Sequence, residues 1–110
     1  MSLGGNFFTD SHESDKHFVI KMLIYKVLRN RGRVVWVEKD FGNAGIADVF
    51  DESEGLVYEI QGTFNKSIVE KKTFLYTKNV LVNDVIVIPL SRFVGTDFVE
   101  YLKILEEIIV

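Results

Sequence analysis

The stretch GIADVFDESEGLVYEIQ, residues 45–61, decides the fold of this chain. Two runs rich in β-branched and aromatic residues, 44–51 and 55–61, are separated by the turn-rich ESEG, which is typical of a β-hairpin. Each run carries an acid in its interior, Asp48 in the first and Glu59 in the second. A carboxylate inside a strand is costly to bury unless something positive meets it. The stretch therefore raises the question of which positive partner these acids have.

The loop of the hairpin predicts how the two acids are placed. If Asp51 and Leu56 close a four-residue loop, Asp48 lies directly opposite Glu59 on one face, and any even-numbered loop preserves this relation. Gln61 follows two residues after Glu59 and therefore shares its face. Like charges opposite each other destabilise a hairpin, and a divalent cation between them reverses the interaction.

The predicted ligand set suits a hard cation. Two carboxylates, a nearby backbone carbonyl and waters are usual for Mg²⁺. We therefore predict Mg²⁺ (or Mn²⁺) bound by Asp48, Glu59 and the backbone of Ile60. Acids in strands also pair with a lysine or face water on an open sheet, and that alternative stays open.

The segments around the hairpin predict an α/β fold. Three consecutive strands form a meander, and a fourth strand that arrives by a helical crossover is expected to pair in parallel. The result is a mixed four-stranded sheet flanked by helices, in the order αβββαβα. We expect one domain over residues 1–110, with 1–13 flexible. The other predicted elements are a helix at 14–31 capped by Ser14, strands at 33–39 and 84–90, and helices at 65–79 and 96–110 capped by Asn65 and Thr96.

Composition limits the classes of function. The chain has 110 residues, no cysteine and a net charge of −3. No apolar run reaches the roughly 18 residues of a membrane span, and the N-terminus lacks the order of a signal peptide, so we expect a cytoplasmic protein without a membrane partner. An acidic net charge counts mildly against nucleic acid, but clustered cations still permit binding. The two basic clusters are Arg29, Arg31, Arg33 and Lys39, and Lys66, Lys71, Lys72 and Lys78.

A polar stripe runs along the first helix. Glu13, His17 and Lys21 stand at i, i+4 and i+8, so they share one face. Placed over the predicted site, these groups could bind metal or phosphate, or move protons. The alternative is a solvated helix face.

Other polar residues allow two interpretations each. Glu38, near the end of the first strand, is either a further metal ligand or a rim acid bonded to Arg33 or Lys39. Lys66, Lys71 and Lys72, which follow the third strand, can contact phosphates or form an ordinary exposed helix face. Trp36 and Tyr58 can stack on bases or pack against helices.

These residues resemble the PD-(D/E)xK nuclease superfamily, whose core runs αβββαβ. Asp48 matches the Asp of its second strand, and Glu59–Ile60–Gln61 matches the acid-x-Lys of its third. Gln61 stands where lysine is usual, and Ala47 stands where proline often precedes the Asp. Within the superfamily the chain looks closest to Holliday junction resolvase-like and competence-protein CoiA-like branches, on the segments HFVIK, VWVEKD, IADV and YEIQ. In the second branch the matched positions are His17, Lys21, Glu38, Asp48, Glu59 and Gln61.

The resemblance implies a restriction-endonuclease-like core and a metal-dependent nuclease that hydrolyses DNA phosphodiester bonds, with structure-specific cutting as in resolvases. Its catalytic residues would be Asp48, Glu59, Gln61, Lys21 and His17. A neighbouring lysine (Lys21, Lys71 or Lys72) would supply the charge that Gln61 lacks. The predicted nucleic-acid contacts are Lys66, Lys71, Lys72, Arg33 and Lys39. The alternative is a non-catalytic binding or assembly subunit on the same fold.

The apolar residues of the last helix, which ends LEEIIV, predict a homodimer. These side chains have more apolar surface than one small core can cover. A two-fold dimer would also allow a small nuclease to read the shape of its DNA.

Overall fold

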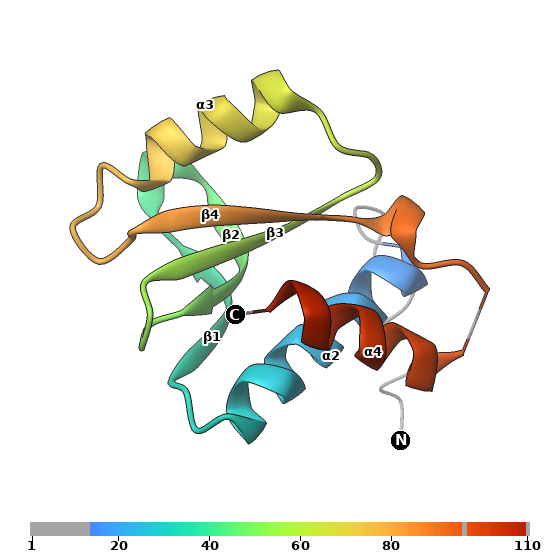
Figure 1. The fold of residues 1–110 in the computed structure, drawn as a ribbon. Coiled ribbons are helices and arrows are strands. Elements are labelled where there is room, and N and C mark those ends of the chain that lie inside the picture. The colour runs from blue at the N-terminus through green and yellow to red at the C-terminus, as the bar shows by residue number, and fades with distance from the viewer. Residues whose placement is uncertain (1–13, 96, 110) are drawn as a thin grey trace, which may run out of the picture.

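A four-stranded sheet with helices on both faces forms the described part of the chain (Figure 1). The computed structural model describes residues 14–95 and 97–109. The order of helices and strands is αβββαβα, as the sequence predicts. The predicted flexible segment 1–13 lies outside the described residues. The elements are α2 (Asp15–Asn30), β1 (Val35–Asp40), η1 (Gly42–Ala44), β2 (Ile46–Asp51), β3 (Leu56–Gln61), α3 (Lys66–Tyr76), β4 (Asp84–Pro89), η2 (Leu90–Arg92) and α4 (Phe98–Ile108).

The sheet has the predicted mixed topology. Its strand order is β1-β2-β3-β4, with β1–β2 and β2–β3 antiparallel and β3–β4 parallel. Asp51 pairs with Leu56 and Val49 with Tyr58, so the register predicted from the four-residue loop is confirmed. Gly55 ends that loop with φ +69°, and a Cβ there would come within 2.6 Å of the Asn83 side chain. The tight turn therefore fixes the register that brings the acids of the two strands together.

Local capping sets the helix boundaries. The Ser14 side chain accepts a hydrogen bond from the His17 N–H at 3.1 Å, and Asn65 accepts one from the Ile68 N–H at 3.1 Å, so both predicted caps are confirmed. Asp97 caps α4, which corrects the prediction of Thr96, a residue outside the described part. These side-chain acceptors satisfy backbone N–H groups that have no partner inside the helix.

The sheet separates two apolar cores. Helices α2 and α4 cover one face, while α3 covers the other (Figure 1). The α2–α4 core includes Val49 and Tyr58, and the α3 core includes Ala47 and Phe50. Helix α3 buries little besides Tyr76, and its Ile68 is 41% exposed. No helix among residues 14–95 and 97–109 is long and apolar enough to cross a membrane.

One predicted DNA-binding residue serves the fold. Arg33 lies between α2 and β1, and its guanidinium donates to the Asp51 carboxylate at 2.8 Å. Asp51 is fully buried at the end of β2. A buried carboxylate needs such a partner, because its desolvation is otherwise uncompensated. Arg33 therefore neutralises a core acid.

We expect Arg33→Met to lower the free energy of unfolding by about 3–5 kcal/mol, because it leaves Asp51 buried without its cation. Urea denaturation at neutral pH measures this loss. Arg29→Met is the matched control: Arg29 is exposed at the end of α2, and its removal should change stability by about 0.5 kcal/mol or less. Equal losses in the two variants would contradict a structural role for the Arg33–Asp51 pair.

Candidate functional site

Three acids lie in one row across the sheet. The pairs Val37↔Val49 and Lys39↔Ala47 flank Glu38 and Asp48, which places these two acids opposite each other. The β2–β3 pairing ends at Val49↔Tyr58, and next to that pair the Asp48 N–H bonds the Glu59 side chain. The structure thus gathers Glu38, Asp48 and Glu59 from β1, β2 and β3.

Asp48 and Glu59 are joined to each other's strands by hydrogen bonds. The Asp48 N–H donates to Glu59 Oε2 at 3.0 Å, and the Ile60 N–H donates to Asp48 Oδ2 at 2.8 Å. Each carboxylate therefore accepts a backbone N–H from the facing strand. Charge-assisted bonds of this kind are stronger than neutral ones, so both carboxylates are held in fixed orientations.

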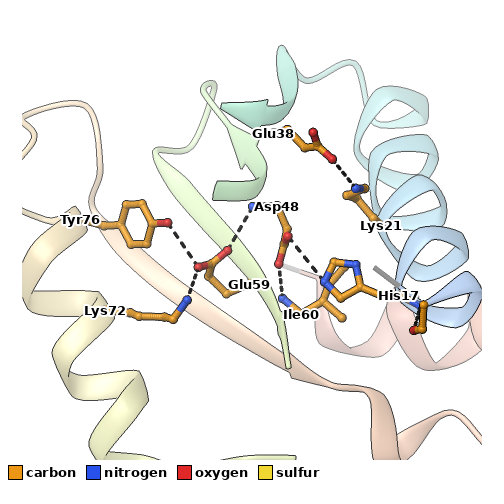
Figure 2. A network of polar contacts seen from close by, with 9 residues as sticks. His17, Lys21, Glu38, Asp48, Glu59, Ile60, Lys72 and Tyr76 are labelled. Atoms are coloured by element: carbon orange, nitrogen blue, oxygen red, sulfur yellow. Dashed lines mark hydrogen bonds and ion pairs between the residues drawn. The ribbon is translucent and has the colours of Figure 1, made fainter. Parts of the chain in front are cut away.

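Glu59 is buried on the α3 side of the sheet. Its side chain is 3% exposed, and its Oε1 accepts from Lys72 Nζ at 2.8 Å and from the Tyr76 hydroxyl at 3.3 Å (Figure 2). Burial raises the pKa of Glu59 and the charge of Asp48 adds to this rise, against the opposing effect of Lys72. Burial and the neighbouring Glu59 charge likewise raise the pKa of Tyr76, which therefore stays a hydrogen-bond donor.

Asp48 is held from the α2 side. Its Oδ1 lies 3.6 Å from His17 Nε2 (Figure 2). Burial favours the neutral acid, but the contacts with His17 and the Ile60 N–H outweigh burial, so the pKa of Asp48 is lowered. Asp48 is thus the more acidic of the two hairpin carboxylates.

The prediction that Asp48 and Glu59 share one face is wrong. Their strands are neighbours, but Asp48 turns toward α2 and Glu59 toward α3 (Figure 2). With strict alternation Ala47 and Val49 would lie on one face, yet they belong to different cores. The alternation therefore breaks at Asp48. The two acids remain close enough for each to shift the pKa of the other.

The backbone at Glu38, on the strand that pairs with β2, is also irregular. It has φ +54°, the one positive φ of a non-glycine residue within the described ranges. Its exposed carboxylate accepts from Lys21 Nζ at 2.7 Å, whereas the ammonium-bearing side chain is only 3% exposed. The predicted partners Arg33 and Lys39 are therefore replaced by Lys21. Backbone strain of this kind collects at functional sites.

The predicted helix stripe faces the site. His17 reaches Asp48 and Lys21 reaches Glu38, both from α2 (Figure 2). These two residues therefore contact the acids of the sheet instead of forming a purely solvated face, and Glu13 lies outside the described part.

The remaining predicted residues are spread more widely. Gln61 ends β3, half-buried and paired with Pro89, and no hydrogen bond joins its side chain to another described residue. Lys66 and Lys71 are exposed on α3, and Lys66 lies 4.0 Å from Glu70. Lys39 lies over the ring of Trp36, 4.6 Å from its centroid. Of these lysines and Gln61, none contacts the two hairpin acids.

The sequence did not single out Tyr76 as a site residue. Tyr76 packs in the α3 core, and its hydroxyl also donates a hydrogen bond to Glu59. Tyr76 follows Lys72 by four residues on a helix, a spacing that places both on one face. This spacing is the sequence feature that could have indicated Tyr76 as a neighbour of Lys72 at the site.

The donor set is compatible with a hard cation. Across residues 14–95 and 97–109, no group of three or more His, Cys, Asp or Glu side chains is arranged to hold a metal ion. Mg²⁺, however, is commonly bound through one or two carboxylates with waters. Asp48 and Glu59 have the oxygen chemistry of such ligands, and they approach from opposite sides of the sheet.

Comparisons of the chain with protein-family models, with curated proteins and with solved structures give no match.

The opposite pKa shifts of the two acids predict opposite effects on stability. The raised pKa of Glu59 contributes stability below its ordinary value of 4.5, and this is lost as pH rises through the folded-state pKa. The lowered pKa of Asp48 contributes stability above 3.8, and this is lost as pH falls through the folded-state pKa. As pH rises from about 3 to 7, the wild type should therefore lose stability relative to Glu59→Gln and gain stability relative to Asp48→Asn.

Urea denaturation of the three proteins at several pH values measures both trends. Glu70→Gln, which changes an exposed acid on α3, is the control and should follow the wild type. Parallel curves for Glu59→Gln and Asp48→Asn would contradict the assigned environments.

Proposed function

We propose that this chain is a metal-dependent nuclease that hydrolyses DNA phosphodiester bonds, with a restriction-endonuclease-like core of the PD-(D/E)xK type. The observation that carries the proposal is the adjacency of Asp48 and Glu59 in neighbouring strands, with Lys72 on Glu59. The element order αβββαβα supports it. The segments that resemble the resolvase-like and CoiA-like branches favour structure-specific cutting.

The chain's own residues divide the work of such a site. Asp48, Glu59 and the backbone of Ile60 would hold Mg²⁺ or Mn²⁺, with Glu38 as a further ligand. The bound ion would lower the pKa of its water and stabilise charge on the phosphate. Gln61 would orient the attacking water through its amide.

The basic residues of the site would serve the reaction and the DNA. His17, beside Asp48, would accept or return a proton, and Lys21 would neutralise Glu38. Lys72, which pairs with Glu59, would bring to the phosphate the positive charge that Gln61 lacks. Lys66, Lys71 and Lys39 would contact the DNA backbone, whereas Arg33 is occupied by Asp51.

A second function is favoured by a separate observation. Both oxygens of Asp48 and both oxygens of Glu59 already have contacts with protein nitrogen or hydroxyl groups. A fully satisfied network can serve structure alone. The alternative is therefore a non-catalytic binding or assembly subunit built on the nuclease fold.

Cleavage assays separate the two functions. We expect the wild type to cut linear, flapped or four-way DNA with Mg²⁺ or Mn²⁺, and Asp48→Ala to lose both cleavage and divalent-cation binding. Gln61→Ala should slow cleavage by about two to four decades while leaving the cation bound, as expected for a water-positioning group. Gln61→Lys should keep or raise the rate.

The controls decide which function stands. Glu70→Ala removes an exposed acid of α3 and should cut DNA as the wild type does. If the wild type cuts none of these substrates and calorimetry finds no divalent-cation binding, the nuclease proposal is rejected in favour of the binding subunit.

We further propose a homodimer, on a different basis from the end of the last helix. Leu105 and Ile109 are buried within the chain, so these two residues of LEEIIV offer no apolar surface to a partner. Exposed apolar side chains lie at the other end of α4, where Val94, Phe98 and Val99 are 82%, 54% and 63% exposed. Such a cluster is typical of an interaction surface.

Light scattering at micromolar concentration is expected to give the mass of a dimer. The variant Val94→Ser/Val99→Ser should give the mass of a monomer, because it removes exposed apolar surface. A monomeric wild type would reject the dimer.

A further inference from the structure

Glu59 has three hydrogen-bond donors, and they differ in how easily they can leave. One is the Asp48 N–H, a backbone group fixed by the sheet. The second is the hydroxyl of Tyr76, a residue that is only 1% exposed. The third is Lys72 Nζ, whose side chain is 35% exposed. Lysine carries a compact charge on a flexible four-carbon stem, so Lys72 is the donor that can move away from Glu59.

Lys72 contacts the oxygen that faces α3. Its ammonium and the Tyr76 hydroxyl both donate to Glu59 Oε1, whereas Oε2 is occupied by the Asp48 N–H. A divalent cation ligated by Glu59 would repel an ammonium at hydrogen-bond distance, since like charges a few ångströms apart interact strongly away from bulk water. Lys72 and a bound cation therefore compete for the same carboxylate.

We propose that Lys72 is an exchangeable counter-ion of Glu59: it neutralises this buried carboxylate until a divalent cation binds, then swings to the rim of the site and pairs with a DNA phosphate. This inference rests on the proposed nuclease function and adds a regulation of the same site.

Glu59 would keep its orientation during this exchange. Tyr76 is fixed by edge-to-face packing on Phe41, with ring centroids 5.6 Å apart. With Tyr76 on one oxygen and the Asp48 N–H on the other, the carboxylate stays in place when Lys72 leaves. The exchange therefore moves one side chain and leaves the sheet unchanged.

The exchange would couple the two ligands of the site. A bound cation frees Lys72 for phosphate, and a phosphate that holds Lys72 frees Glu59 for the cation. Each ligand therefore raises the affinity of the other, as thermodynamic linkage requires. Lys71 directly precedes Lys72 and is exposed on α3. It has no contact with Glu59 in the described structure, so it cannot act as this counter-ion.

Calorimetric titration of Mn²⁺ into the full chain, without DNA, tests the exchange. Lys72→Met removes the competitor and should raise Mn²⁺ affinity about tenfold, the scale on which one adjacent charge changes a carboxylate's affinity for a proton. Lys72→Arg keeps the charge and should bind Mn²⁺ no more tightly than the wild type. Lys71→Met, the matched control, removes the same charge from the neighbouring position and should change the affinity less than about twofold.

The outcomes separate this inference from the function on which it rests. If the wild type binds Mn²⁺ and Lys72→Met binds it no more tightly, the exchange is rejected and the nuclease site stands. If neither the wild type nor any variant binds Mn²⁺, both are rejected. Thermal melts verify that each variant is folded, and Lys72→Gln replaces Lys72→Met if the latter is not.

Discussion

The burial of the Glu59 carboxylate in the middle of the sheet is the constraint on which the candidate site depends. A buried carboxylate is tolerated only where donors or cations compensate its lost hydration. Here the compensation comes from three groups on two elements: the Asp48 N–H of β2, and Lys72 and Tyr76 of α3. The position of α3 over the sheet is therefore tied to the charge of one residue in β3.

The row of acids across the sheet is also where the strands depart from regular geometry. Glu38 adopts a positive φ, and the alternation of side chains along β2 breaks between Ala47 and Val49. Regular strands would have placed Asp48 on the α3 side, next to Glu59 and without the His17 contact. The irregularity separates two like charges and gives each its own basic partner (Figure 2). Strain that persists in a fold is commonly retained for function.

The net charge of −3 does not describe the local charge around the candidate site. Cations from two helices converge on the acids: His17 and Lys21 from α2, and Lys72 from α3. This local balance is what a structural network and a metal-dependent site have in common. A metal-dependent site differs from a structural network in that a cation can replace one of the hydrogen-bond donors of Glu59. Lys72 is the donor with the exposure and flexibility to be replaced.

The sequence by itself determined the element order, the caps Ser14 and Asn65, and the register of the hairpin. These features follow from local rules of spacing and turn length, which act within a few residues. The tertiary structure alone decided that Asp48 turns toward His17 and that Lys72, rather than Lys71, meets Glu59. Those outcomes depend on the break in alternation at Asp48 and on how α3 is rotated over the sheet. Both arise from packing between segments far apart in the chain, which local periodicity does not encode.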